Sequence, residues 1–369
     1  MSRARAVIRV DASIDIGSGH VMRCLTLATA LRAAGMLPTF VTREHAGHLA
    51  ALIERRGFDC RRLPAPSRSS DAGAGAERGH ASWLGCGQDV DAAQTREALR
   101  RVGDAIDWLI VDHYALDAEW ERRLRPCVRH VMVIDDLADR PHDCDVLLDQ
   151  NPYPDADNRY PAFVSPSCEL LLGPRYALLP PDFRVQRAVA ASRQASEPYR
   201  LLVFFGGVDA TGETGKFIAA WSSVRRPDLK ADVLIGVANP HAETLIRMAA
   251  GVRGIRLYRH VDDMASMMAR ADYAFGGSGV TNWERFCIGL NCTITAVAPN
   301  QVELARHLGE IGLVDYAGDW LQTTRATYER LLRNLAPASD ASRARRTRIR
   351  QQVDGSGCDR VVNRLMERE

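Results

Sequence analysis

Short apolar runs rich in β-branched residues alternate with helical segments along this chain, and no other feature restricts its fold as strongly. Besides the run that ends at Val10, we expect strands at residues 38–42, 107–112, 130–134, 146–151, 170–173, 200–205, 232–236, 255–258, 273–275 and 291–297. Such runs predict an α/β fold, in which a parallel sheet carries helices on both faces. Ligands of these sheets bind beyond the carboxyl ends of the strands, where this chain places glycines, aspartates and histidines.

The alternation of strands and helices starts at the N-terminus and starts again near residue 200, which indicates two domains. Residues 1–180 are expected to form an N-terminal Rossmann-like domain, 181–199 a linker, and 200–369 a C-terminal domain that ends in two basic helices. A length of 369 residues also favours two domains. We therefore predict two doubly wound domains that face a central cleft. Residues 64–87 are rich in Ser, Gly, Ala and Pro and are expected to be a surface insertion with little chemistry.

Composition narrows the class of partner. A net charge of +2 gives no case for nucleic acid, so we expect a small-molecule substrate. The nine cysteines form no C-x-x-C pair, which favours reduced thiols over a zinc site or a disulfide framework. The first residues lack the apolar core of a signal peptide, and no apolar run approaches the roughly 20 residues of a membrane span. The expectation is a monomeric cytoplasmic protein.

The opening unit runs from a strand through Gly17-Ser18-Gly19 into a helix that His20 begins. Glycines let the backbone approach a ligand, and the free N–H groups of a helix start favour negative charge. His20 is the side chain at this tip that can exchange protons near neutral pH. A tight turn in which His20 caps or packs locally is the alternative. No third glycine follows, so the loop is not a dinucleotide fingerprint and NAD chemistry is disfavoured.

A second glycine-rich turn, Gly276-Gly277-Ser278-Gly279, lies between a predicted strand and a helix. Its backbone N–H groups can hold a pyrophosphate, and the alternative is a turn without a ligand. Glu284, five residues past Gly279, can accept hydrogen bonds from two ribose hydroxyls. Gly206 and Gly207 follow the first strand of the second domain and could hold a phosphate in the same way. Close packing of the backbone explains these two glycines almost as well.

Acidic residues follow two strands of the first domain. Asp112-His113-Tyr114 offers a carboxylate, an imidazole and a phenol that face the expected cleft, although Asp112 could instead cap the next helix. Asp135 and Asp136 could bind Mg²⁺, cap a turn or orient His20. No further carboxylate has a ligand-like spacing, so we expect neither a metal nor another cofactor. The chain also lacks a Gly-x-Ser-x-Gly elbow and a nucleophilic cysteine motif.

Several of these motifs, in this order, resemble the UDP-2,4-diacetamido-2,4,6-trideoxy-β-L-altropyranose hydrolases of pseudaminic acid biosynthesis. The matching segments are residues 17–25, 111–114, 134–138, 144–151, 171–179, 276–278 and 283–285. The C-terminal half is also similar to the glycosyltransferase that adds N-acetylglucosamine to lipid I, through residues 260–264, Thr281 and Glu284. The resemblance extends from about residue 7 to about 315, apart from the insertion.

The resemblance implies the GT-B architecture, with UDP on the C-terminal domain and the chemistry on the N-terminal domain. Uracil would meet the backbone from Val261 to Met264, the phosphates the turn at Gly277-Ser278-Gly279, and ribose Glu284. His20 would activate water, and Tyr114 would position water or sugar. Arg23, one turn after His20, could support the loop. The candidates are His20, Asp112 and Tyr114 for catalysis, and Gly17, Gly19, Arg23, Asn151, Gly206, Gly207, Val261, Met264, Gly277, Ser278, Gly279, Asn282, Glu284, Asn300 and Gln301 for substrate binding.

The function expected from these residues is hydrolysis of a UDP-linked 2,4-diacetamido-2,4,6-trideoxy sugar with inversion and without a metal. An imidazole at the cleft can take a proton from water, and backbone donors can meet the charge of the leaving UDP. Two alternatives stay open. One is a GT-B glycosyltransferase that uses the same donor with a sugar or lipid acceptor, and the other is a nucleotide-sugar binding protein without catalysis.

Overall fold

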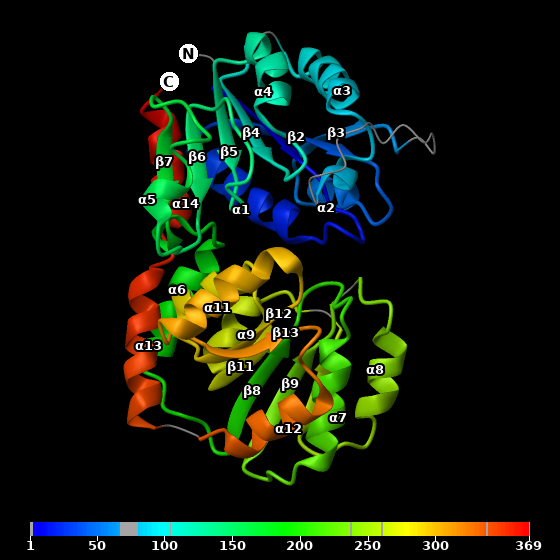
Figure 1. Cartoon of the computed structure of the whole chain (residues 1–369), viewed down its shortest axis with the longest axis vertical. Coiled ribbons are helices and arrows are strands. Elements are labelled where there is room, and N and C mark those ends of the chain that lie inside the picture. Colours follow the sequence, from blue (N-terminus) through cyan, green and yellow to red (C-terminus); the bar gives the residue numbers. More distant parts are fainter. Residues whose placement is uncertain are drawn as a thin grey trace. The chain divides into compact units, whose positions relative to one another are not determined.

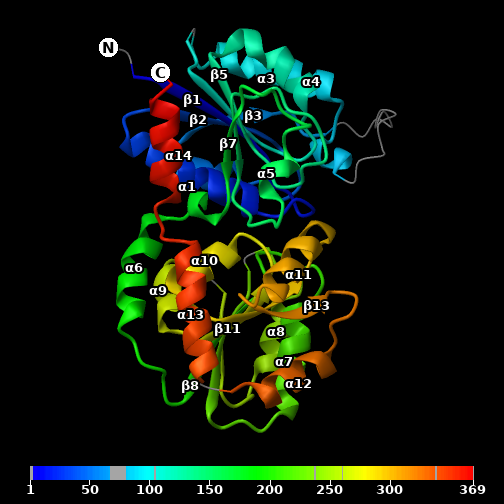
Figure 2. The same ribbon diagram turned by 60° about the vertical axis from the view of Figure 1, so that its left-hand side comes forward.

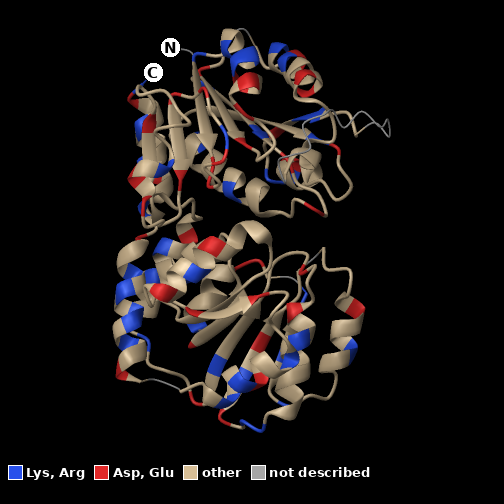
Figure 3. Cartoon of the chain, in the orientation of Figure 1, with Lys and Arg blue, Asp and Glu red and all other residues tan. Residues whose placement is uncertain are grey.

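The computed structural model describes residues 3–66, 80–103, 105–236, 238–259, 261–336 and 339–368 of the chain. The chain forms two compact units (Figure 1), one made of residues 1–178 and 357–369 and the other of residues 179–356. Charged residues mark the helices and loops of both units, whereas most strand residues are uncharged (Figure 3). This distribution is expected for parallel sheets that are covered on both faces.

Unit 1 is built on a parallel sheet of seven strands in the order β3-β2-β1-β4-β5-β6-β7. The strands are β1 (Arg5–Val10), β2 (Leu37–Arg43), β3 (Asp59–Leu63), β4 (Trp108–Asp112), β5 (His130–Ile134), β6 (Val146–Asp149) and β7 (Glu169–Leu172). The helices are α1 (Gly19–Ala33), α2 (Ala50–Arg55), α3 (Gln88–Arg100), α4 (Ala118–Leu124), α5 (Ala156–Arg159) and α14 (Gly357–Met366), with 3₁₀ turns at Ala81–Leu84, Arg125–Cys127 and Pro174–Tyr176.

The core of unit 1 lies on both faces of this sheet, because successive strand residues point to opposite sides. Ile8 and Ile110 pack with residues of α1 and α14, such as Leu27 and Leu365. On the opposite face, Val7, Leu109 and Val111 pack with residues of α3 and α4, among them Leu99 and Trp120.

Unit 2 is built on a parallel sheet of six strands in the order β10-β9-β8-β11-β12-β13. The strands are β8 (Tyr199–Phe204), β9 (Leu229–Leu234), β10 (Ile255–Tyr258), β11 (Tyr273–Gly277), β12 (Cys292–Ala296) and β13 (Asp315–Asp319). The helices are α6 (Pro181–Ala191), α7 (Glu213–Ser223), α8 (Ala242–Ala249), α9 (Met264–Arg270), α10 (Thr281–Ile288), α11 (Val302–Glu310), α12 (Arg325–Asn334) and α13 (Asp340–Gln352), with a 3₁₀ turn at Pro299–Gln301. The predicted α/β class is therefore correct for both units.

The boundaries of the units differ from the expected ones at both ends of the second domain. Residues 181–191, expected within a linker, form α6, which packs against α9 and α10 of unit 2. The last helix, α14, belongs to unit 1 and packs against α1, as Figures 1 and 2 show. Its apolar residues Val361, Val362 and Leu365 are buried there, and this burial holds the end of the chain on the first unit.

Two further observations concern the whole chain. Each of the nine cysteines carries a free thiol. Within the described ranges, no helix combines the length and the apolar character that a membrane crossing requires.

Candidate functional site

The order of the strands brings two of the predicted motifs together in unit 1. The chain leaves β1 toward β2 and later returns on the other side of β1 as β4, so β1 and β4 are neighbours. Val10 at the end of β1 pairs with Asp112 at the end of β4. The loops that follow these strands leave in opposite directions, and ligands of α/β sheets bind at such a switch point.

The loop after β1 has the predicted form of a strand, a glycine turn and a helix. Gly17 has a φ of +79°, a left-handed conformation that glycine adopts without strain. Its N–H donates to the carbonyl of Ser13 at 2.9 Å. Gly19 then begins α1, which places His20 in the first turn of the helix.

His20 is held by the carboxylate of Asp112. Nδ1 of the imidazole lies 2.6 Å from Oδ1 of Asp112, while Arg23 donates to both oxygens of that carboxylate at 2.6 Å. Arg23 is 4% exposed, so its guanidinium positions Asp112 and supports the loop. Cys24 donates its thiol to Oδ2 of Asp112 at 3.3 Å. The alternative role of Asp112 as a helix cap does not arise, because Asp117 caps α4.

The protonation of this pair follows from its charges. Burial by itself raises the pKa of Asp112, but the charge of Arg23 and the hydrogen bonds from Arg23 and His20 outweigh it and hold the pKa well below its ordinary value. A carboxylate without a proton can approach Nδ1 at 2.6 Å only if Nδ1 carries the hydrogen. In the neutral imidazole Nε2 is then the proton acceptor, and none of the described residues forms a hydrogen bond with it. The arrangement is that of an oriented general base.

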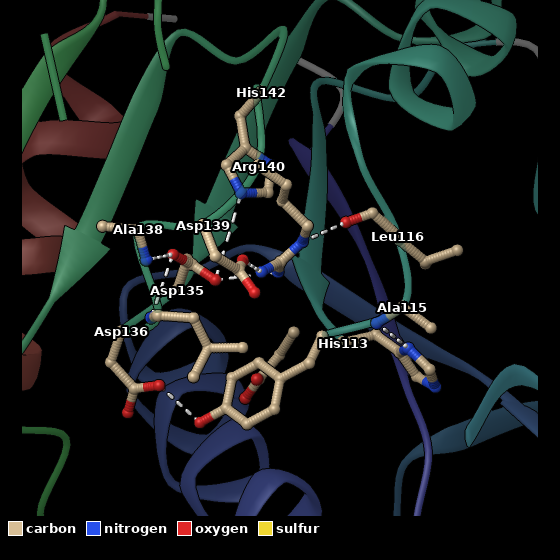
Figure 4. Close-up of polar contacts among 12 residues, drawn as sticks. His113, Ala115, Leu116, Asp135, Asp136, Ala138, Asp139, Arg140 and His142 are labelled. Carbon is tan, nitrogen blue, oxygen red and sulfur yellow. Dashed lines mark hydrogen bonds and ion pairs between the residues drawn. The ribbon is translucent and has the colours of Figure 1, made fainter. Parts of the chain in front are cut away.

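Tyr114 lies beside His20, with the two rings edge to face and their centroids 4.7 Å apart. Its hydroxyl donates to Oδ1 of Asp136 at 2.5 Å, a contact drawn beside Asp136 in Figure 4. Asn151 donates to the other oxygen of Asp136 at 3.2 Å. Burial, followed by the charge of Asp136, raises the pKa of Tyr114 well above its ordinary value. Tyr114 is therefore a neutral phenol whose hydroxyl proton is held in the hydrogen bond to Asp136.

Asp135 serves as the cap of a turn, one of the roles weighed for it. Its carboxylate accepts from the backbone N–H groups of Leu137 and Ala138 at 3.2 and 2.9 Å and pairs with Arg140 at 2.8 Å (Figure 4). Within the described ranges, no group of three or more His, Cys, Asp and Glu side chains could hold a metal ion.

His113 does not share a site with Asp112 and Tyr114, which corrects the expectation that the three face one cleft. Its Nε2 lies 3.3 Å from Oδ2 of Asp11, and its Nδ1 accepts from the N–H of Ala115 at 3.1 Å. Neighbouring residues at a strand end point in opposite directions, so His113 turns away from His20.

The expected insertion contributes residues that the sequence did not single out. Residues 67–79 lie outside the described part of the chain, but the 3₁₀ turn Ala81–Leu84 is described. Its Trp83 stacks on Tyr114, with 5.6 Å between ring centroids, and His80 lies against both rings. His80 and Trp83 therefore pack on Tyr114, whereas residues 64–87 were expected to be a surface insertion. The sequence feature that could have identified these residues is the aromatic pair His-x-x-Trp, formed by His80 and Trp83.

In unit 2 the candidates follow the carboxyl ends of four strands. Gly206 and Gly207 follow β8, Val261 and Met264 follow β10, the turn from Gly277 to Gly279 starts at the last residue of β11, and Asn300 and Gln301 follow β12. His260 of the resemblance lies outside the described residues. The neighbouring strands β8 and β11 again form a switch point. Gly207 also packs closely on Gly236, where an added Cβ would lie 2.1 Å from the carbonyl oxygen of Gly207.

Buried side chains hold the turn after β11. Arg285 donates to the carbonyl of Gly277 and to Oδ1 of Asn282, both at 2.7 Å, and Asn282 donates to the hydroxyl of Ser278 at 3.2 Å. Asn282 is fully buried and Ser278 is 1% exposed. These two side chains therefore shape the turn, although both stand among the residues expected to bind the substrate.

Glu284 differs from the other acidic residues of unit 2. It is half-buried, and no hydrogen bond joins its carboxylate to any described residue. Burial raises the pKa of Glu284 to about 7, although the charge of Arg285 opposes the shift. Hydroxyl donors from a ligand would stabilise the ionised carboxylate.

No protein-family model matches the chain. It is 28% identical over 159 residues to the spore coat polysaccharide biosynthesis protein SpsG of Bacillus subtilis (strain 168), which covers 42% of this chain and 46% of that protein. It is 25% identical over 313 residues to the UDP-2,4-diacetamido-2,4,6-trideoxy-beta-L-altropyranose hydrolase of Campylobacter jejuni subsp. jejuni serotype O:2, which covers 84% of this chain and 97% of that enzyme. The chain is also 20% identical to the uncharacterized protein MJ1062 of Methanocaldococcus jannaschii. It spans about half the length of MJ1062 and about half the length of SpsG.

Solved structures share the fold over almost the whole chain. MurG of Acinetobacter baumannii has a TM-score of 0.68 at 16% identity, covering 99% of this chain and 100% of that chain. The calicheamicin glycosyltransferase CalG4 has a TM-score of 0.63 at 15% identity, covering 100% of this chain and 98% of that chain. The expected resemblance to the hydrolase and the expected GT-B fold are both confirmed.

Proposed function

We propose that this chain hydrolyses the anomeric C–O bond of a UDP-linked 2,4-diacetamido-2,4,6-trideoxy sugar and releases the free sugar and UDP. The observation that carries the proposal is the pair of His20 and Asp112, which leaves Nε2 of His20 as a proton acceptor in unit 1. The alignment with the hydrolase over 97% of that enzyme's length supports the choice of substrate.

In the proposed reaction Nε2 of His20 removes a proton from a water molecule as the water oxygen attacks the anomeric carbon. The bond from that carbon to the phosphate oxygen breaks, and UDP leaves with the electron pair. Because water enters opposite to the leaving group, the anomeric configuration inverts. Asp112 stabilises the imidazolium that forms on His20, and this proton then passes to solvent.

Unit 2 is assigned to UDP. The backbone N–H groups of the turn from Gly277 to Gly279 and at the start of α10 would meet the charge that develops on the phosphates. Glu284 would accept hydrogen bonds from the ribose hydroxyls. In this scheme no step requires a metal.

The test is UDP release in buffered water with EDTA and without an acceptor. We expect the UDP-linked diacetamido sugar to release UDP, and NMR of the first product to show the inverted anomer. A screen of UDP- and CMP-sugars measures the preference for the sugar and the nucleotide.

A glycosyltransferase is the second candidate, since CalG4, a glycosyltransferase, has the same fold. UDP release that starts only when a sugar or lipid acceptor is added would support it against the hydrolase. Tight UDP binding without turnover of any donor would support a binding protein.

Glu284→Gln is expected to have opposite effects on stability and on UDP binding. Since the pKa of Glu284 is raised to about 7 in the folded chain, stability falls as the pH rises from the ordinary value of 4.5 to about 7. Gln does not ionise, so at pH 8 the variant should be more stable by about 1–3 kcal/mol, whereas its affinity for UDP should fall roughly 10-fold. Urea unfolding at about pH 5 and pH 8 and calorimetric titration with UDP measure both effects.

The matched control is Glu310→Gln, an exposed residue at the end of α11, which should change neither quantity. For the native chain, UDP affinity should increase as the pH rises through about 7, because only the ionised carboxylate accepts from both hydroxyls. An equal stability difference between Glu284→Gln and the native chain at both pH values would contradict the raised pKa.

A further inference from the structure

Four aromatic rings from three segments of unit 1 meet around the proposed base. His20 comes from α1, Tyr114 follows β4, and His80 and Trp83 come from the segment before α3. The rings of His80 and Trp83 are 4.5 Å apart, those of His80 and Tyr114 5.2 Å, and those of His20 and Trp83 6.1 Å. Together with the stacked pair of Trp83 and Tyr114, these contacts form one continuous aromatic surface.

The members of this surface differ in exposure. His20 and Tyr114 are 9% and 6% exposed, whereas His80 and Trp83 are half-buried and present the accessible part. Burial lowers the pKa of His80, so its ring is uncharged at neutral pH. The aromatic surface beside His20 is therefore uncharged, although it lies near charged groups such as Asp136 and Arg140.

We propose that Trp83 and His80 form a subsite that binds the methyl groups of a deoxygenated, acetylated sugar. This inference rests on the proposed function, because it concerns the sugar of the same substrate. A 2,4-diacetamido-2,4,6-trideoxy sugar carries a C6 methyl group and two acetyl methyl groups, which pack favourably on aromatic rings. A sugar with a C6 hydroxyl would lose water from that hydroxyl against the ring carbons, and only the ring nitrogens of His80 and Trp83 could replace those hydrogen bonds. The subsite therefore selects 6-deoxy over 6-hydroxy sugars.

The first experiment compares Trp83→Ala, Trp83→Phe and Ser82→Ala with the native chain. Ser82 is exposed on the same 3₁₀ turn and serves as the matched control. The substrates are the UDP-linked 2,4-diacetamido-2,4,6-trideoxy sugar and UDP-N-acetylglucosamine, which keeps its C6 hydroxyl. For Trp83→Ala we expect the KM of the deoxy substrate to rise about 10-fold and the preference between the two sugars to fall by a similar factor. Trp83→Phe should be intermediate, and Ser82→Ala should match the native chain.

A second experiment measures binding without hydrolysis. Saturation-transfer NMR of the free diacetamido sugar with the full chain should show saturation at its methyl protons, which Trp83→Ala removes and Ser82→Ala retains. Methyl contact in a native chain that releases no UDP would support the subsite and overturn the proposed reaction. UDP release without methyl contact or without a preference would overturn the subsite alone. Equal losses of kcat for both sugars would assign Trp83 a purely structural role and overturn the subsite, and a chain that neither binds nor hydrolyses would overturn both proposals.

Discussion

Replacing His20 with Gln should lower kcat for UDP release by roughly 10²- to 10⁴-fold, the usual contribution of a positioned general base. Gln keeps a polar side chain of similar length but cannot take the proton from water. The affinity for UDP should stay within about twofold, since the residues assigned to UDP lie on unit 2 and this change removes a group that acts in the transition state. Steady-state kinetics and calorimetric titration with UDP measure the two quantities separately.

Asp112→Asn tests the orientation of the same base. An amide at this position does not fix the hydrogen on Nδ1 of His20, and it leaves the buried guanidinium of Arg23 with only the more distant carboxylate of Asp136, at 3.9 Å, as an anion. We expect a loss of kcat similar to that of His20→Gln, together with lower stability. Asp139→Asn is the control, because Asp139 pairs with Arg140 at a half-exposed position and forms neither a hydrogen bond nor an ion pair with His20 in the described structure.

The pH dependence provides a further check on this pair. Because the pKa of Asp112 is held well below its ordinary value, its contribution to stability is present above that value and is lost only in strong acid. A pH-rate profile between about 5 and 8 therefore does not report Asp112. If His20→Gln retained native turnover, the base would be another group, and the proposed mechanism would be wrong.

Asp91→Ala should cost about 3–5 kcal/mol of unfolding free energy, because it leaves buried cations without their shared anion. Asp91, on α3, is fully buried and accepts from Arg9 at 2.7 Å and from Arg43 at 2.6 Å. Trp120 donates its indole N–H to the same carboxylate at 3.0 Å. The carboxylate thus ties α3 to β1, β2 and α4. Urea unfolding at neutral pH measures the loss.

The control for this change is Asp89→Ala, two positions earlier at the start of α3, where the side chain is exposed. It removes one exposed charge near a helix start and should cost about 1 kcal/mol or less. Although burial raises the pKa of Asp91, Arg9 and Arg43 lower it below 3.8 overall. Its stabilisation is therefore complete near neutral pH and is lost as the pH falls through that lowered pKa. Equal stabilities of the two variants would show that the network adds no net stability.

The pattern predicted the central strands of both sheets and the edge strands β7 and β10. The runs at 107–112 and 130–134 correspond to β4 and β5, whereas β3 (Asp59–Leu63) and β13 (Asp315–Asp319) were not predicted. Both of these strands lie at the edge of their sheets and carry charged residues. An edge strand is half-exposed and needs no continuous apolar run, so its pattern resembles that of a loop.

The candidate site was predictable only in part. His20, Asp112 and Glu284 stand at turns that the sequence marks with glycines and polar residues. Trp83 stands in a segment whose composition indicates an insertion, and only its contact with Tyr114 shows that it borders the site. The sequence also could not predict that α14 packs on unit 1, because an apolar stripe on a helix does not indicate which sheet the helix covers.

The sequence by itself determined the α/β class, the repetition of the pattern in two units and the strand ends that carry polar side chains. Periodicity and turn chemistry are local, so they can be recognised without knowing the neighbours in space. Only the tertiary structure decided which strand ends become neighbours. The pairing of β1 with β4 brings Asp112 to His20 across 92 positions of the chain, and Arg23 then keeps that carboxylate ionised. The order of strands in a sheet depends on the packing of the whole unit, and the proposed base depends on that order.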